Sequence, residues 1–170
     1  MNLREYIRDI PDFPQKGIIF RDITPLLRNP EAFKKAIDDL CEKLQNLDFD
    51  LIVAPEARGF IFGGAISYKL KKGFVPVRKP GKLPFNIISE KYSLEYGTAE
   101  LQMHADAIEK GQKAIIFDDV LATGGTAKAL KNLVEKSGGE VVAMVFLIEL
   151  TYLNPRDFLQ GEEIISLIKL

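Results

Sequence analysis

Three apolar runs constrain the fold of this chain more than any other feature. They are Leu51–Ala54, Ala114–Phe117 and Val141–Leu150. Runs without strict apolar–polar alternation are typical of strands buried on both faces, as in a parallel sheet covered by helices. Helix candidates lie between them, at 60–71 and 126–137. This order predicts βαβ units, and therefore an α/β fold with a mainly parallel twisted sheet flanked by helices.

The amino-terminal part predicts two more helices. A short amphipathic helix is expected over 2–10, before Pro11. Asn29 is a good N-cap residue, and Pro30 suits the first position of a helix. Apolar side chains then recur at helical spacing, at Phe33, Ile37, Leu40, Cys41, Leu44 and Leu47. We therefore predict a core-facing helix over 30–46.

Composition limits the remaining classes of protein. A chain of 170 residues without repeats or linkers fits one domain over 1–170. Its 23 Lys and Arg balance 24 Asp and Glu, which does not favour wholesale binding to nucleic acid. One cysteine excludes an internal disulfide and a Cys-rich zinc site. With no signal-peptide pattern and no run of ~18 apolar residues, we expect a cytoplasmic protein that does not span a membrane.

The segment 114–126 carries the most chemical information. Its buried strand leads into two acids and a short loop, Asp118, Asp119, Ala122, Thr123, Gly124, Gly125 and Thr126. The glycines let the backbone approach a ligand, the threonine hydroxyls can donate, and the following helix N-terminus favours anions. Ligands bind at the carboxyl ends of strands in open α/β sheets. The loop therefore predicts a phosphate site, although it is not a Walker loop.

The paired acids need a partner other than phosphate, because two carboxylates would repel an anion. Ribose hydroxyls and a hydrated Mg²⁺ are the natural choices for Asp118 and Asp119. The alternative is a strand-end pair that caps a turn beside an ordinary Thr-Gly-Gly loop. The complete thirteen-residue arrangement favours the phosphate-site interpretation.

This arrangement resembles the signature of the type I phosphoribosyltransferases, which bind 5-phosphoribosyl-1-pyrophosphate (PRPP). Further segments resemble the adenine-specific branch of that family, namely Pro11–Asp22, Glu56–Phe60, Arg78–Pro84 and Tyr92–Gly97. The resemblance implies the type I phosphoribosyltransferase fold with a small amino-terminal hood over 1–28. It also implies transfer of the phosphoribosyl group to adenine, giving AMP and pyrophosphate in purine salvage, with Mg²⁺ as cofactor.

The resemblance also implies roles for residues around the donor. The loop Ala122–Thr126 would hold the 5′-phosphate. Asp118 and Asp119 would hold the ribose hydroxyls and approach Mg²⁺ through water. The pyrophosphate would bind Arg58, Arg78, Lys79 and Lys82. Taken without the resemblance, Arg78, Lys79 and Lys82 would be interpreted as a solvated basic loop. The alternative for Arg58 is a solvated arginine at a helix start, which the helix dipole disfavours.

Adenine would lie beneath the hood. The resemblance places Ile19 and Phe20 on the base, with backbone groups of Ile19 and Arg21 reading its edge and Leu150 on its other face. The alternative for the three apolar residues is ordinary core. An apolar site with a few backbone hydrogen bonds can distinguish an amine from a carbonyl oxygen.

A polar, poorly periodic stretch over 79–97 is expected to be a long loop, and long loops are often functional. The resemblance makes it a mobile lid. Glu95 would exchange a proton with the purine imidazole nitrogen, and Tyr96 would be a lid aromatic. The resemblance further implies a homodimer, in which Arg78 is a candidate to reach the neighbouring subunit's site.

Two other functions remain open at this point. One is transfer to a 6-oxopurine or to orotate, which the hood and the segment Tyr92–Gly97 disfavour. The other is a non-catalytic regulator that keeps the PRPP pocket and binds nucleic acid. The balanced charge and the lack of a spare segment for a DNA-binding module disfavour it.

Overall fold

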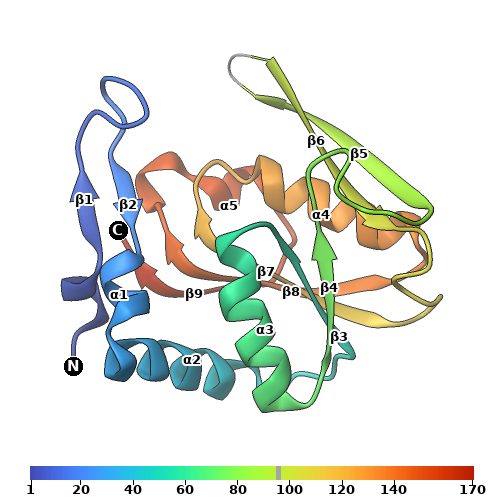
Figure 1. Ribbon diagram of the computed structural model, residues 1–170, viewed down its shortest axis with the longest axis horizontal. Helices are drawn as coiled ribbons and strands as arrows, with labels where there is room; N and C mark the ends of the chain where they lie inside the picture. The colour runs from blue at the N-terminus through green and yellow to red at the C-terminus, as the bar shows by residue number, and fades with distance from the viewer. Residues whose placement is uncertain (95–96) are drawn as a thin grey trace.

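A five-stranded parallel sheet forms the centre of the computed structural model, which describes residues 1–94 and 97–170 (Figure 1). Its strand order is β4-β3-β7-β8-β9. The strands are β3 (Leu51–Pro55), β4 (Gly73–Val77), β7 (Lys113–Leu121), β8 (Glu140–Glu149) and β9 (Ile164–Lys169). All neighbouring pairs run parallel. The predicted α/β class and parallel sheet are confirmed, and the three apolar runs form the three central strands.

Helices cover both faces of this sheet. They are α1 (Thr24–Arg28), α2 (Pro30–Leu44), α3 (Arg58–Leu70), α4 (Gly125–Lys136) and α5 (Pro155–Phe158). Alternate residues of each central strand face opposite layers: Ile115 and Phe117 pack with α2 and α3, whereas Ile116 packs with α4. As predicted, Asn29 caps α2, where its Oδ1 accepts a hydrogen bond of 2.9 Å from the Ala32 amide.

The helix predicted over 2–10 is wrong in its second half. A 3₁₀ turn, η1 (Leu3–Tyr6), is followed by β1 (Arg8–Ile10), which pairs antiparallel with β2 (Phe20–Asp22). So short a helix is marginal in water, and pairing with β2 satisfies the backbone groups instead. This hairpin projects beside the end of the main sheet and forms the hood (Figure 1).

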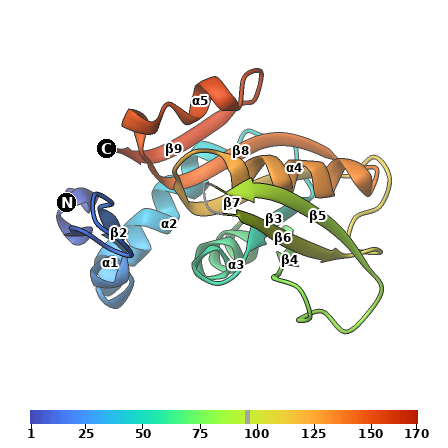
Figure 2. The same ribbon diagram turned by 90° about the horizontal axis from the view of Figure 1, so that it is seen from above.

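The long loop predicted over 79–97 is also corrected. Two antiparallel strands, β5 (Ile87–Leu94) and β6 (Gly97–His104), form a hairpin packed on α4 (Figure 2), so only 79–86 remains a connection of this kind. Polar Glu90 obscures the strand pattern because it faces α4, where the Asn132 amide donates to its carboxylate over 3.0 Å. The predicted lid residues Glu95 and Tyr96 lie outside the described residues.

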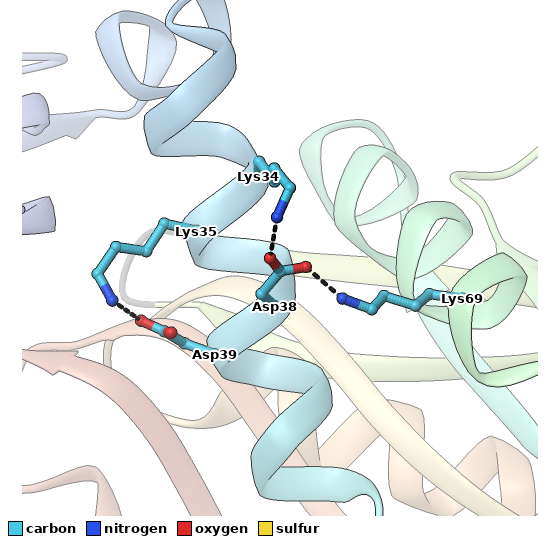
Figure 3. A network of polar contacts seen from close by, with 5 residues as sticks. All are labelled: Lys34, Lys35, Asp38, Asp39 and Lys69. Atoms are coloured by element: carbon cyan, nitrogen blue, oxygen red, sulfur yellow. Dashed lines mark hydrogen bonds and ion pairs between the residues drawn. The ribbon is translucent and has the colours of Figure 1, made fainter.

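An ion-pair network on the outer surface joins α2 to α3 (Figure 3). Asp38 accepts from Lys34 at 2.6 Å and from Lys69, while Lys35 pairs with Asp39 at 2.8 Å. Hydrogen bonds from the two lysines lower the pKa of Asp38 to about 2. Exposed pairs of this kind contribute little to stability, so the network is a useful place for control substitutions.

Candidate active site

Three cavities meet at the carboxyl edge of the main sheet, where β3, β7 and β8 end and the β1–β2 hairpin lies nearby. A cleft of about 400 Å³ lies between the ends of β3 and β7, and a cavity of about 610 Å³ lies under the hood. A third, of about 70 Å³, is formed by the loop after β7. Ala122 lines all three, so this loop is the junction of the site.

The predicted phosphate loop encloses the smallest of these cavities. Its lining includes every residue of Ala122–Thr126 together with Asp118. Gly124 has a φ of +101° and immediately precedes α4, so the loop turns sharply into the helix N-terminus. Backbone amides at a helix N-terminus are well placed for an anion. The geometry of the loop is compatible with an anionic ligand, and the phosphate site itself stays a prediction.

The space beside Gly124 is limited by side chains of the protein and not only by the room that a bound phosphate would need. A Cβ at this position would lie 3.0 Å from Phe158 Cδ1 and 3.2 Å from Leu159 Cγ. Those side chains support the loop from the side of α5. A larger residue would therefore collide with Phe158 and Leu159 and displace the loop. It would also be strained by the positive φ of this position.

We expect Gly124→Ala to lower the free energy of unfolding by ~1–3 kcal/mol, the usual cost of a non-glycine residue in such a conformation. The loop would also bind ribose 5-phosphate more weakly. Gly64→Ala is the matched control, since Gly64 is helical and a Cβ there has open space, so it should stabilise the protein. Urea unfolding compares the two, and equal effects would contradict this account of Gly124.

The acid pair lies between the phosphate loop and the cleft. Asp118 lines both of these cavities, and its Oδ1 accepts a 2.9 Å hydrogen bond from the Asp119 amide. Asp119 is buried, and Arg58 Nε donates to its carboxylate. Burial and the adjacent Asp119 charge raise the pKa of Asp118 well above its usual range. A pair of acids held in this way carries unfavourable negative charge that a hydroxyl-bearing or cationic ligand would relieve.

Arg58 begins α3 directly after the β3 turn, whose Glu56–Ala57 peptide is cis. Its guanidinium carbon lies 5.4 Å from the centre of the Phe20 ring, so it is held between Asp119 and an aromatic of the hood. The arginine therefore lines the cleft from a defined position, and its role in binding a ligand stays a prediction.

The other predicted cations are placed differently. Lys79 lines the cleft, but Arg78 and Lys82 are not among the described lining residues. Arg78 Nε donates to Glu56 Oε1 over 3.1 Å, and the Lys79 amide donates to the same oxygen over 3.0 Å. Glu56 was missed by the sequence reasoning. The available signal was an acid between a buried strand and Arg58.

The cavity under the hood is predominantly apolar. It is lined by Gly17, Ile18, Ile19, Arg21, Ala122, Thr123, Leu150, Tyr152 and Leu153. Ile19 is 43% exposed, which contradicts the ordinary-core alternative for this residue. Leu150 directly follows β8, is buried in the hydrophobic core and also lines this cavity.

Phe20 is not brought into this cavity. Successive side chains of a strand point to opposite faces, and Ile19 and Arg21 take the cavity side. The Phe20 ring instead packs edge-on against Phe13, with ring centres 5.2 Å apart, and against Arg58. Tyr152, which the sequence reasoning missed, lies beside the Arg21 guanidinium in the cavity wall.

No group of three or more metal-binding His, Cys, Asp or Glu side chains occurs in the described ranges 1–94 and 97–170. Asp118 and Asp119 supply two neighbouring carboxylates, a donor set that suits Mg²⁺ when substrate and water complete the coordination. Within the same ranges, no helix is long and apolar enough to cross a membrane.

Comparisons with known proteins agree with this fold. Residues 23–156 match the family model described as the phosphoribosyl transferase domain. An adenine phosphoribosyltransferase of Thermosipho africanus is 80% identical, over 99% of both chains. A crystal structure of the same-named enzyme from Thermoanaerobacter pseudethanolicus has a TM-score of 0.96 at 55% identity, covering 99% of this chain and 100% of that one. The Saccharomyces cerevisiae enzyme, solved with adenine and an imino-altritol bisphosphate, has a TM-score of 0.89 at 38% identity, covering 96% and 95%.

Proposed function

The chain belongs to the phosphoribosyl transferase family, and from this premise we propose that it transfers the phosphoribosyl group of PRPP to adenine, giving AMP and pyrophosphate. Relatives that match nearly its whole length carry the name of this activity. The family supplies the reaction class, and the hood supplies the argument for adenine as the acceptor.

One observation carries the proposal: Ala122 lines a tight loop cavity, a charged cleft and an apolar cavity at once. The substrates also divide into three parts, a phosphate, a ribosyl pyrophosphate and a flat base. The loop suits the 5′-phosphate, the cleft suits the pyrophosphate, and the hood cavity suits the base. Asp118, at the junction of loop and cleft, is placed for the ribose hydroxyls.

Arg58 and Lys79 are the cleft cations for the leaving pyrophosphate. A guanidinium can donate two parallel hydrogen bonds to a diphosphate and spread the charge that develops on it. In the described chain Arg58 donates to Asp119 through Nε, so the N–H groups of its two terminal nitrogens are the donors for phosphate oxygens. We assign Lys82 and Arg78 a secondary role, since neither is among the described lining residues of the cleft.

Adenine is assigned to the space between Ile19 and Leu150. Backbone groups at Ile19 and Arg21 are the candidates to read the edge of the base, and Tyr152 adds an aromatic wall. Phe20 acts through Arg58 and not on the base, which revises the role that the resemblance implies for it. The nucleophilic imidazole nitrogen attacks the anomeric carbon as the bond to pyrophosphate breaks.

Glu95 and Tyr96 keep the roles that the resemblance implies, although they lie outside the described residues. Glu95 accepts the proton that the imidazole nitrogen releases when the new bond forms. Closing of the lid over the donor would exclude water that otherwise hydrolyses it.

Mg²⁺ is assigned to the pyrophosphate and ribose side of the cleft, with Asp118 and Asp119 approached through water. When bound, it neutralises charge on the leaving pyrophosphate.

From the family resemblance we also propose a homodimer in the cytoplasm. Sedimentation equilibrium tests the first point and cell fractionation the second; a monomer, or a secreted protein, would contradict them.

The direct experiment is conversion of labelled adenine to AMP by the purified protein with PRPP and Mg²⁺. We expect one pyrophosphate for each AMP and no turnover with EDTA, restored by added Mg²⁺. Absence of AMP in the complete mixture would contradict the proposal and favour a regulator that only binds PRPP. Full turnover in EDTA would contradict the assignment of Mg²⁺.

A further inference from the structure

Tyr92 reaches the phosphate loop from outside it. It lies on β5, and its hydroxyl is 3.4 Å from Thr126 Oγ1. Its ring also approaches the first residue of α4, since a Cβ on Gly125 would lie 3.6 Å from the Tyr92 Cδ2 atom. Tyr92 and Thr126 both line the charged cleft. The contact therefore joins the hairpin to the loop at the edge of the site.

The side of β5 that carries Tyr92 is anchored to α4. Glu90, two residues earlier on the same face, accepts from Asn132 Nδ2 at 3.0 Å and from Lys136 Nζ at 2.5 Å. These contacts hold β5 against the helix that begins at the phosphate loop. The strand therefore fixes the position of Tyr92 beside Thr126.

Hydroxyl chemistry gives this contact a direction when an anion is bound. Each hydroxyl has one proton to donate and can also accept. A phosphate oxygen accepts hydrogen bonds, so a Thr126 hydroxyl that binds it must donate its proton to the phosphate. Its oxygen is then free to accept, and the Tyr92 hydroxyl lies next to it in a contact in which either oxygen can be the donor. The 3.4 Å separation exceeds the ~2.7–2.8 Å optimum for such pairs, so a small approach of the hairpin would strengthen the bond.

We propose that Tyr92 is a positioning residue for the phosphate group of the substrate: it donates to Thr126 Oγ1 and thereby directs the Thr126 proton to the phosphate. This inference rests on the proposed function, because it takes the loop Ala122–Thr126 to be the 5′-phosphate site. It goes further because it gives β5 a part in binding PRPP. The hydroxyl that does this belongs to Tyr92 and not to the loop or to Glu95 and Tyr96.

The test measures ribose 5-phosphate binding to the full chain by titration calorimetry. Tyr92→Phe removes the hydroxyl and keeps the ring, and we expect it to weaken binding about five- to tenfold, the effect of about one hydrogen bond. In steady-state assays the KM for PRPP should rise by a similar factor while kcat at saturation stays within about twofold. Tyr68→Phe is the control, because Tyr68 is 89% exposed on α3 and lines none of the three cavities.

A second pair of variants separates positioning from packing. In a Thr126→Val background Tyr92→Phe should have no further effect on binding, whereas in a Thr126→Ser background, which keeps a hydroxyl, the full effect should remain. Equal effects of Tyr92→Phe in the valine and serine backgrounds would overturn the proposal, as would unchanged ribose 5-phosphate affinity in Tyr92→Phe alone. If the parent protein itself fails to bind ribose 5-phosphate, the proposed phosphate site fails instead.

Discussion

Asp118→Asn is expected to make the unliganded protein more stable while lowering kcat/KM for PRPP by ~10²–10³, the usual loss for one transition-state hydrogen-bonding group. The carboxylate lines both the phosphate loop and the cleft, where the ribose of the donor is proposed to lie. Asparagine keeps an oxygen that can accept from the Asp119 amide. It removes the charge that burial and Asp119 make unfavourable.

The sign of the stability effect follows from the raised pKa of Asp118. Because the folded state holds this proton more tightly than the unfolded state, stability is highest below the unfolded pKa and falls as pH rises through the folded pKa. The stability advantage of Asp118→Asn over the parent should therefore increase from pH 5 to pH 8. Urea unfolding at both pH values measures it.

Asp38→Asn is the matched control. The pKa of Asp38 is lowered to about 2, so its contribution is already complete above the unfolded pKa and is lost only at lower pH. This variant should be slightly less stable than the parent at pH 5 and pH 8 alike, with unchanged turnover, because the network in Figure 3 lies outside the site. A destabilised Asp118→Asn, or one with full activity, would contradict the described role of Asp118.

Glu95→Gln is expected to lower kcat by ~10²–10⁴, the usual contribution of general acid–base catalysis. Glutamine keeps the size of the side chain but cannot accept the purine proton. The KM for PRPP should change little, because Glu95 is assigned to the base and not to the phosphates. Single-turnover kinetics with saturating adenine separates the chemical step from product release.

Glu100→Gln is a suitable control for Glu95→Gln. Glu100 lies on β6 of the same hairpin and accepts from Gln102 at 3.2 Å, outside the described lining of the cleft. It should retain kcat. Full kcat in Glu95→Gln would contradict proton transfer by Glu95, and an equal loss in both variants would point to the hairpin as a whole.

The central layer of the molecule was predictable because its signals are local and strong. Apolar runs are obligatory for strands buried on both faces, and Asn29-Pro30 specifies a helix start by its own hydrogen bonding. The turn from β7 into α4 was equally predictable, since a glycine at positive φ, threonine hydroxyls and a helix N-terminus all belong to one short segment.

The outer layer was not predictable, because its structure depends on partners far away in the chain. Arg8–Ile10 becomes a strand only by pairing with Phe20–Asp22. The sequence around Glu90 resembles a polar loop, because the partner of Glu90, Lys136, is distant in the chain. Phe20 is not among the lining residues of the hood cavity, because strand alternation gives that side to its neighbours, and the pairing of Arg58 with Asp119 spans 61 positions. Such contacts have no signature in a single segment.

The measurement that tests the central claim most directly is a purine competition with the parent protein, PRPP and Mg²⁺. Adenine and hypoxanthine differ at the 6-position, where an amine donates and a carbonyl oxygen accepts. Backbone groups under the hood that pair with the amine would be left unpaired by the carbonyl. We expect kcat/KM for adenine to exceed that for hypoxanthine and for guanine by ~10² or more. Comparable values for adenine and hypoxanthine would contradict the assignment of the hood cavity to adenine.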